Sequence, residues 1–463
     1  MAEASKYFLT EEQLRAEFDL TVQRYVFDGY QPQPDQPVLV LLGAQPAAGK
    51  SQAMQATQRA YEGADLVPLT GDELRSLHPR YDELRREGPQ TFETGTAQAS
   101  GPWVRMSIDY ALKNRYSLVL EGVFRDPAMT ISTAERFAAA GFRVEIVALG
   151  VREERSRLDA LHRFLTPGTG LPGRWTPPEL QDLSYRMMPE TVAAAEASAI
   201  VQRITITNRT GADLYVNERS PDGRWRSAPA AVQALQSERA RPLPATEAQS
   251  WLSRYQQVIV TFAGEGRVDE ASGGVLQRLT ADADAVVAMA YPDPRSPSRS
   301  AHEAAQRLLR GLASGPLPAG QPLPLSFQTD EEIAQRRLHL TAAVQSAEGA
   351  AQRAEGQMGS LVQRLTDQGA PPERVNRART SLHEDQEHAR QRGTKLRHQL
   401  SQVSAEQERR RQLPSAHQQV ESGIRAQVHA AHPVLAQQPH RQSATGPRLD
   451  GPQHPGPRRG LSQ

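Results

Sequence analysis

The stretch that decides the fold is VLVLLGAQPAAGKSQAMQATQRAYEG, residues 38–63. It begins with five apolar residues typical of a buried strand, continues through the loop GAQPAAGKS (residues 43–51), and ends in a helical pattern. A strand, a tight loop and a helix N-terminus form the context that a Walker A phosphate-binding loop requires. The backbone amides of such a loop contact phosphate oxygens at the positive end of the helix.

The loop predicts a site for nucleotide phosphates and Mg²⁺. Lys50 would reach the outer phosphates, and the Ser51 hydroxyl would hold Mg²⁺. The consensus G-x-x-x-x-G-K-[ST] needs glycine where this chain has Ala44, and Ala47 stands where another glycine is often found. A chance GKS string is the competing interpretation, and the flanking strand and helix argue against it. The predicted phosphate site comprises Gly43, Ala44, Gln45, Pro46, Ala47, Ala48, Gly49, Lys50 and Ser51.

Four more short apolar runs follow, at residues 65–69, 117–121, 144–150 and 203–207, with helical patterns between them. Their continuous apolarity is typical of strands covered on both faces. A succession of strands and helices predicts an α/β fold with a parallel sheet wrapped by helices. Ligands of such sheets bind at the carboxyl ends of the strands.

Acidic residues stand where two of these strands end. Asp72 follows the second strand, where an acid can take or orient the proton of an attacking hydroxyl. A helix N-cap is the alternative for Asp72. Glu121 ends the third strand and Arg125 follows it. Ordinary solvated loop charge is the alternative for these two residues.

Arginines follow the fourth strand. The helical pattern at residues 151–164 contains Arg163, and a Gly/Pro-rich loop after it contains Arg174. Phosphoryl transfer spreads negative charge over the transferred group, which arginines can neutralise. The sequence therefore favours Arg163 and Arg174 for this role, against the alternative of a basic solvated helix.

Changes in composition along the chain divide it into four predicted segments. The α/β pattern and a small appendage predict a domain at residues 1–245, in which Thr10 and Gln13 begin the first helix as a capping box. Helices and a linker are expected at residues 246–328, and a long helical hairpin at residues 329–412. The Pro-, Gln-, Gly- and His-rich residues 413–463 are expected to be disordered.

Composition narrows the function classes. The chain has 463 residues, a net charge of +1 and no cysteine. The charge favours neither nucleic acid nor an anionic membrane as a partner. The missing cysteine excludes disulfides, thiolate nucleophiles and cysteine zinc sites. Neither a membrane span nor a signal-peptide apolar region is evident, which predicts a cytoplasmic protein.

Several strings in the chain resemble the zeta toxin family, the kinase toxins of epsilon–zeta toxin–antitoxin systems. The strings are LLGAQPAAGKS, DELRSLHPRYDEL, LVLEGVFRD, LHRF and GRWTP, and the resemblance covers roughly residues 8–230. Its most specific element is D-x-x-R-x-x-H-P-x-Y, formed by Asp72, Arg75, His78, Pro79 and Tyr81.

The resemblance implies a P-loop kinase similar to adenylate kinase. Family members phosphorylate the 3′-hydroxyl of UDP-N-acetylglucosamine and so block cell-wall synthesis. It also implies that an antitoxin, or an inhibitory region of the same chain, is a partner.

The resemblance also implies roles for individual residues. Lys50 and Ser51 would hold ATP–Mg²⁺, and Asp72 would be the general base. Arg163 and Arg174 match the family's phosphate-neutralising arginines. The positions that would line the sugar-nucleotide pocket are Glu121, Arg125 and Thr133. Here the family's usual E-G-T reads Glu121-Gly122-Val123, which removes one hydroxyl from that pocket.

Two other functions stay open. A degenerate nucleotide-binding protein that acts through its C-terminal helices is favoured by Ala44. An antibiotic or metabolite kinase on the same fold is the other. Asp72, Glu121 and the two arginines together favour an enzyme.

Overall fold

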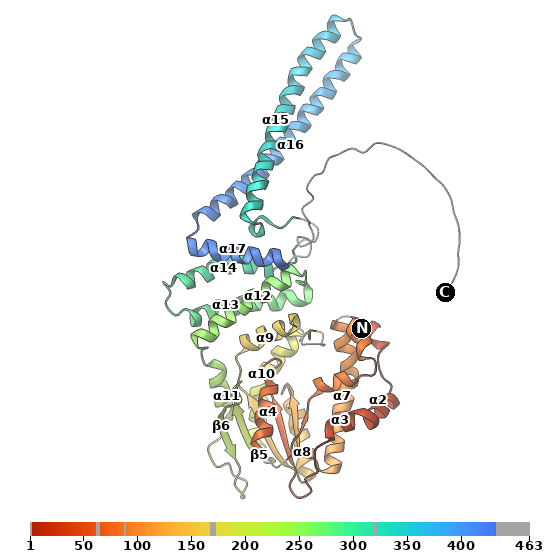
Figure 1. Ribbon diagram of the computed structural model, residues 1–463, viewed down its shortest axis with the longest axis vertical. Helices are drawn as coiled ribbons and strands as arrows, with labels where there is room; N and C mark the ends of the chain where they lie inside the picture. Colours follow the sequence, from red (N-terminus) through yellow and green to blue (C-terminus); the bar gives the residue numbers. More distant parts are fainter. Residues whose placement is uncertain (1, 62–64, 88, 167–172, 318–321, 432–463) are drawn as a thin grey trace, which may run out of the picture.

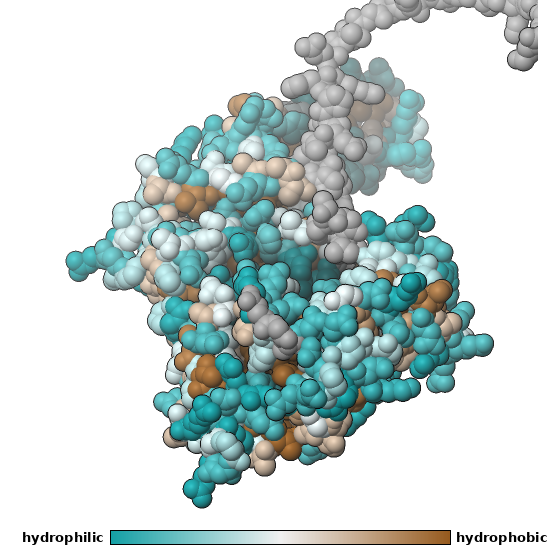
Figure 2. All heavy atoms as spheres, turned by 60° about the horizontal axis from the view of Figure 1, so that its bottom comes forward, coloured by the Kyte–Doolittle hydropathy of each residue, from teal (hydrophilic) through white to brown (hydrophobic). Residues whose placement is uncertain are grey.

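The computed structural model describes residues 2–61, 65–87, 89–166, 173–317 and 322–431. An α/β domain lies at one end of the molecule, a layer of helices covers one side of it, and a long helical hairpin projects from that layer (Figure 1). Hydrophilic residues dominate the face seen in Figure 2, where hydrophobic residues occur as separate spots. In the described part of the chain, no helix has the length and apolarity needed to cross a membrane.

The α/β domain contains one sheet of six strands in the order β2-β3-β1-β4-β5-β6. The first five are parallel, as the apolar runs predict, and β6 pairs with β5 antiparallel. The sequence missed β6 because it is an edge strand with Leu214 and Val216 exposed, and so carries no buried run. The strands are β1 (Val38–Gly43), β2 (Val67–Leu69), β3 (Leu118–Gly122), β4 (Arg143–Leu149), β5 (Val201–Thr207) and β6 (Asp213–Glu218).

Helices surround this sheet. The capping box predicted at the first long helix is present: Thr10 Oγ1 accepts from the Gln13 amide and Gln13 Oε1 from the Thr10 amide. Helix α2 continues through a π-helical turn, Phe18–Val22, into α3, and a 3-10 turn, Arg75–Leu77, follows α5. The helices of this part are α1 (Ala2–Ser5), α2 (Glu11–Glu17), α3 (Gln23–Phe27), α4 (Lys50–Ala60), α5 (Gly71–Leu74), α6 (Tyr81–Arg86), α7 (Pro89–Asn114), α8 (Pro127–Ala139), α9 (Glu153–Leu165), α10 (Pro178–Ala197) and α11 (Ala231–Ala240).

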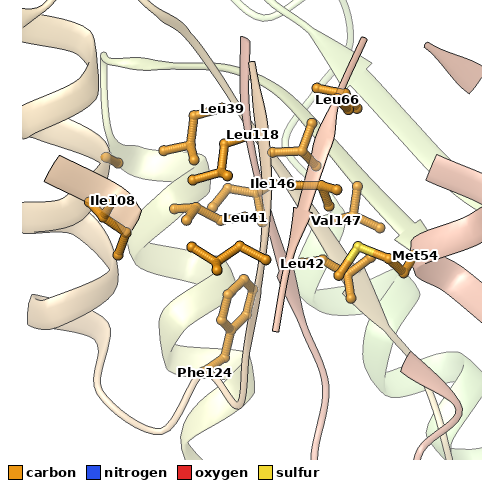
Figure 3. Packing of buried hydrophobic residues seen from close by; sticks show 14 of the residues in the cluster. Leu39, Leu41, Leu42, Met54, Leu66, Ile108, Leu118, Phe124, Ile146 and Val147 are labelled. Atoms are coloured by element: carbon orange, nitrogen blue, oxygen red, sulfur yellow. The ribbon is translucent and has the colours of Figure 1, made fainter. Parts of the chain in front are cut away.

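The core of the domain lies on both faces of the sheet. Leu39 and Leu42 of β1 are fully buried. Met54 of α4 and Ile108 of α7 approach the strands from opposite sides (Figure 3). The expectation of strands covered on both faces is therefore confirmed.

Four helices form a second core, and we call them the helical layer: α12 (Ala245–Gly264), α13 (Glu270–Ala290), α14 (Pro297–Ala313) and α17 (Ser415–Ala431). Ile424 and Val428 of α17 are fully buried in it. The expectation of a disordered tail from Leu413 is therefore wrong for residues 415–431, because an apolar face every four residues packs on α12 and α14. The rest of that tail, residues 432–463, lies outside the described residues.

The hairpin consists of α15 (Asp330–Asp367) and α16 (Pro372–Gln412). A capping box of Thr329 and Glu332 begins α15. Its largest apolar cluster lies at the base, where Ile333, Leu340 and Val403 are buried. Beyond it, the buried apolar residues of α15 are small or single ones: Val344, Ala347, Ala351 and Ala354. The distal part is held by pairing of two mainly hydrophilic helices, so the base alone joins it to the helical layer.

Candidate active site

A cavity of about 600 Å³ opens at the carboxyl ends of β1, β2 and β3. The phosphate-binding loop, the segment after β2, the end of β3 and two arginines contribute its walls. Most residues selected from the sequence line it, namely Pro46, Ala47, Gly49, Lys50, Ser51, Asp72, Glu121, Arg163 and Arg174. These residues are far apart in the chain, and the sheet brings them together at one edge.

The backbone of the loop shows at which position an alanine in place of the consensus glycine strains the chain. Gly49 is the N-cap of α4 with φ 95°, a conformation natural only for glycine. Ala47 has φ 59°, whereas Ala44 is not among the residues with positive φ. Gly43 is needed for packing, since a Cβ there would lie 2.1 Å from the Phe124 ring. The missing glycine at position 44 therefore costs no backbone strain, and the strain lies at Ala47.

Lys50 lines the cavity, and its side chain is largely buried. Its Nζ donates to the carbonyl oxygens of Ala44 at 3.2 Å and Gln45 at 3.3 Å, and lies 3.5 Å from Glu121 Oε1. Burial lowers the pKa of Lys50, and the Glu121 carboxylate opposes that shift. The ammonium is thus a poorly hydrated cation for which an incoming phosphate can compete.

Asp72 does not cap a helix. The Thr70 hydroxyl accepts hydrogen bonds from the amides of Asp72, at 3.2 Å, and Glu73, at 3.4 Å, and is the N-cap of α5. The alternative N-cap interpretation of Asp72 is therefore wrong. Its carboxylate instead forms ion pairs with Arg174 and, at 3.6 Å, with Arg75 Nε.

Glu93 is a cavity residue that the sequence analysis missed. Its Oε1 lies 2.9 Å from Arg75 Nη2 and 3.7 Å from Arg174 Nε. Burial raises the pKa of Glu93, and Arg75 lowers it. No strand end marks this residue, because it lies in the first turns of α7, and only the contact between helices brings it to the cavity.

Arg163 and Arg174, which we call the cavity arginines, line the same cavity. Arg163 Nη2 donates to Thr176 Oγ1 at 3.1 Å. Burial lowers the pKa of both guanidinium groups. In the described part of the chain, the Nε of each is buried without a hydrogen-bond acceptor. Both are therefore partly buried cations, which attract an anion that enters the cavity more strongly than fully solvated cations would.

Some predicted site residues lie elsewhere. The Gln45 side chain points to the start of α9, where its Nε2 donates to the Val151 carbonyl oxygen at 2.9 Å. Arg125 is exposed, and the Thr133 hydroxyl donates to the Met129 carbonyl oxygen within α8 at 2.9 Å. Gly43, Ala44, Gln45, Ala48, Arg125 and Thr133 are not among the residues that line the cavity.

The parallel sheet, the glycine-capped loop before α4 and the buried lysine define a P-loop kinase fold. Residues 24–220 match the family model described as Zeta toxin, so this part of the chain is similar to the zeta toxin family. The resemblance noted from the motifs is thereby confirmed. The matched residues span the whole sheet and end before the helical layer and the hairpin begin.

Known proteins resemble the same part. The chain is 29% identical to Toxin PezT of Streptococcus pneumoniae serotype 4 over 185 residues, which are 39% of this chain and 72% of that protein. It is 25% identical to Toxin zeta of Enterococcus hirae over 228 residues, 49% of this chain and 77% of that protein. A solved chain of the PezAT chromosomal toxin–antitoxin system of S. pneumoniae aligns with 24% identity and a TM-score of 0.46, covering 54% of this chain and 98% of that one.

Proposed function

We propose that this protein is an ATP-dependent kinase that phosphorylates a hydroxyl of a sugar nucleotide, with UDP-N-acetylglucosamine as the first acceptor to test. The observation that carries the proposal is the convergence of Lys50, Asp72, Glu121 and the cavity arginines on one cavity at the strand ends. The family supports the acceptor, because the resemblance implies sugar-nucleotide phosphorylation.

The loop residues fit ATP. The amides of the loop and of the first turn of α4 would hold the phosphates, and the desolvated Lys50 would exchange its contacts with the Ala44 and Gln45 carbonyl oxygens for phosphate oxygens. Ser51 would hold Mg²⁺ through its hydroxyl, which lines the cavity. When bound, Mg²⁺ neutralises charge on the phosphates.

Asp72 would act as the general base. Its carboxylate takes the proton of the acceptor hydroxyl while that oxygen bonds to the γ-phosphorus, and the bond from the γ-phosphorus to the β–γ bridging oxygen breaks to release ADP. Lys50 and the cavity arginines neutralise the charge on the transferred group. Because Arg174 is paired with Asp72, phosphate binding to Arg174 would free the base as ATP arrives.

The chemistry of the cavity walls suits a polyhydroxylated acceptor. The carboxylates of Glu73, Glu93 and Glu121 line it, and carboxylates accept hydrogen bonds from hydroxyls. Trp175 offers an aromatic face. Arg125 and Thr133 would contact only a part of the acceptor that extends beyond the cavity.

The biological role follows from the family. In this proposal the protein is the toxin of a toxin–antitoxin pair that blocks cell-wall synthesis in the cytoplasm. An antitoxin protein, or an inhibitory region within the chain, would keep the kinase inactive.

The test is phosphoryl transfer by the purified full chain. Mg-ATP is incubated with UDP-N-acetylglucosamine, UDP-glucose and free N-acetylglucosamine, and phosphate adducts are detected by mass spectrometry. We expect an adduct of a sugar nucleotide that disappears with Lys50→Ala and persists with Lys113→Ala, a control distant from the loop. Nucleotide binding without any adduct would instead favour the degenerate binding protein.

A further inference from the structure

Helix α9, which carries Arg163, belongs to two cores at once. Leu158 and Leu161 on one face are buried in the core of the helical layer. On the other side, Ser156 Oγ lies 3.4 Å from Gln45 Nε2 of the phosphate-binding loop and 3.3 Å from Gln181 Nε2 of α10. A displacement of the layer would therefore move a helix that contacts the loop and supplies a cavity arginine.

Polar contacts fix α9 to the layer. Trp251 Nε1 of α12 donates to the Glu154 carbonyl oxygen at 3.1 Å. Arg157 of α9 is 5% exposed and forms ion pairs with Asp282 of α13 and with Glu153 of its own helix. A buried guanidinium without its partner carries a large desolvation cost. The ion pair with Asp282 therefore helps to fix the position of α9 against the helical layer.

An aromatic chain runs from the layer to the cavity wall. The Phe164 ring stacks on Phe262 of α12, with centroids 5.8 Å apart. It also meets Trp175 edge-on at 5.2 Å. Phe164 directly follows Arg163, and Trp175 directly follows Arg174 and lines the cavity. The ring of Phe262, which is fully buried, thus supports the neighbours of both cavity arginines.

We propose that the helical layer, which lies outside the zeta toxin match, positions the cavity arginines for phosphoryl transfer, and that Asp282 and Phe262 are its positioning residues. This inference rests on the proposed function. Positioning matters because a misplacement of about 1 Å costs about 100-fold in rate. The arginines act most strongly on the transition state, so the layer raises turnover rather than ATP affinity.

The test compares variants of the full chain. Asp282→Asn keeps the side-chain shape and leaves Glu153 as the partner of Arg157, so we expect it to fold. Asp284→Asn is the matched control, because Asp284 lies on the same helix and pairs with Arg310 within the layer. Turnover, ATP affinity and hydrogen–deuterium exchange of the α9 peptides are measured for each variant.

We expect Asp282→Asn to lower kcat by about 10- to 100-fold without changing the ATP dissociation constant, and to speed exchange in α9. Asp282→Glu should restore part of the rate, and Phe262→Leu should reproduce the loss through the aromatic chain. Asp284→Asn should match the parent.

Three results would overturn the inference. Parental turnover in Asp282→Asn would make the contact merely structural, and faster turnover would make the layer an inhibitor. The exchange measurement needs no turnover: unchanged exchange in α9 refutes the coupling itself. A parent that binds ATP without transferring phosphate contradicts the proposed function instead.

Discussion

Glu145 links the stability of the kinase domain to pH. It lies on β4 and is 2% exposed. Burial raises its pKa from 4.5 to about 7, against an opposing effect of Arg203. Between pH 4.5 and 7 the folded chain holds a proton that the unfolded chain releases. The free energy of unfolding therefore falls as the pH rises through this window.

The size of the effect follows from the pKa. A rise from 4.5 to about 7 corresponds to about 3 kcal/mol between the two protonation states. Glu145→Gln removes the charge and keeps an oxygen that accepts the Tyr61 hydroxyl hydrogen. It loses the ion pair with Arg143, but that guanidinium is 35% exposed and keeps Glu218 as a partner, so we assign this loss about 1 kcal/mol. We expect a net gain of about 2 kcal/mol at pH 8.

Urea unfolding of parent and variant at pH 5 and pH 8 measures this difference. The variant should be more stable than the parent at pH 8, and the advantage should shrink or vanish at pH 5, where the parent carboxyl is mostly protonated. Glu135→Gln, at an exposed position on α8, is the control and should show no such dependence. A variant that is less stable than the parent at pH 8 would refute the reasoning.

Three other predictions test the loop, the hairpin and α17. Ala47→Gly should relieve left-handed strain worth about 1–2 kcal/mol and tighten ATP binding measured by calorimetry, while Ala44→Gly should not; equal effects would contradict the assignment of strain to Ala47. Replacing residues 348–392 by a short glycine-serine turn should leave turnover unchanged and lower the melting temperature only slightly, because Ala347 and Gly393 face each other across the hairpin and the buried apolar side chains removed are the small ones of Ala351 and Ala354; loss of folding would show that the distal part stabilises the chain. Ile424→Ala should cost about 2–5 kcal/mol of stability in urea unfolding, and parental stability would show that α17 is not part of the core.

Continuous apolar runs made five strands predictable, since both faces of a parallel sheet are covered. Two elements, β6 and α17, were not predicted, and the reasons differ. Strand β6 is an edge strand with exposed apolar side chains. Helix α17 has Val420, Ile424 and Val428 at four-residue spacing, a signal that the surrounding Gln, His and Pro composition outweighed.

Most of the candidate site was predictable because its residues stand at strand ends or in the loop. Asp72, Glu121 and Lys50 do so, and the structure brings them to one cavity with Arg163 and Arg174, which were predicted from their place after the fourth strand. Glu93 approaches from a helix, so no local pattern marks it. The consensus suggested that Ala44 disrupts the loop, but a consensus sequence does not say which residue has a positive φ. In the structure that residue is Ala47.

The central claim is that Asp72 takes a proton during phosphoryl transfer, and a rate measurement on Asp72→Asn tests it most directly. Transfer from ATP to UDP-N-acetylglucosamine is followed for the parent, for Asp72→Asn and for Asp82→Asn, a control on the exposed face of α6. We expect the parent and Asp82→Asn to transfer phosphate at the same rate. Asp72→Asn should transfer phosphate about 10²- to 10⁴-fold more slowly than the parent. Its ATP affinity should not fall, because loss of the Asp72 carboxylate leaves Arg174 free to bind phosphate. Transfer by Asp72→Asn at the parental rate would contradict the account.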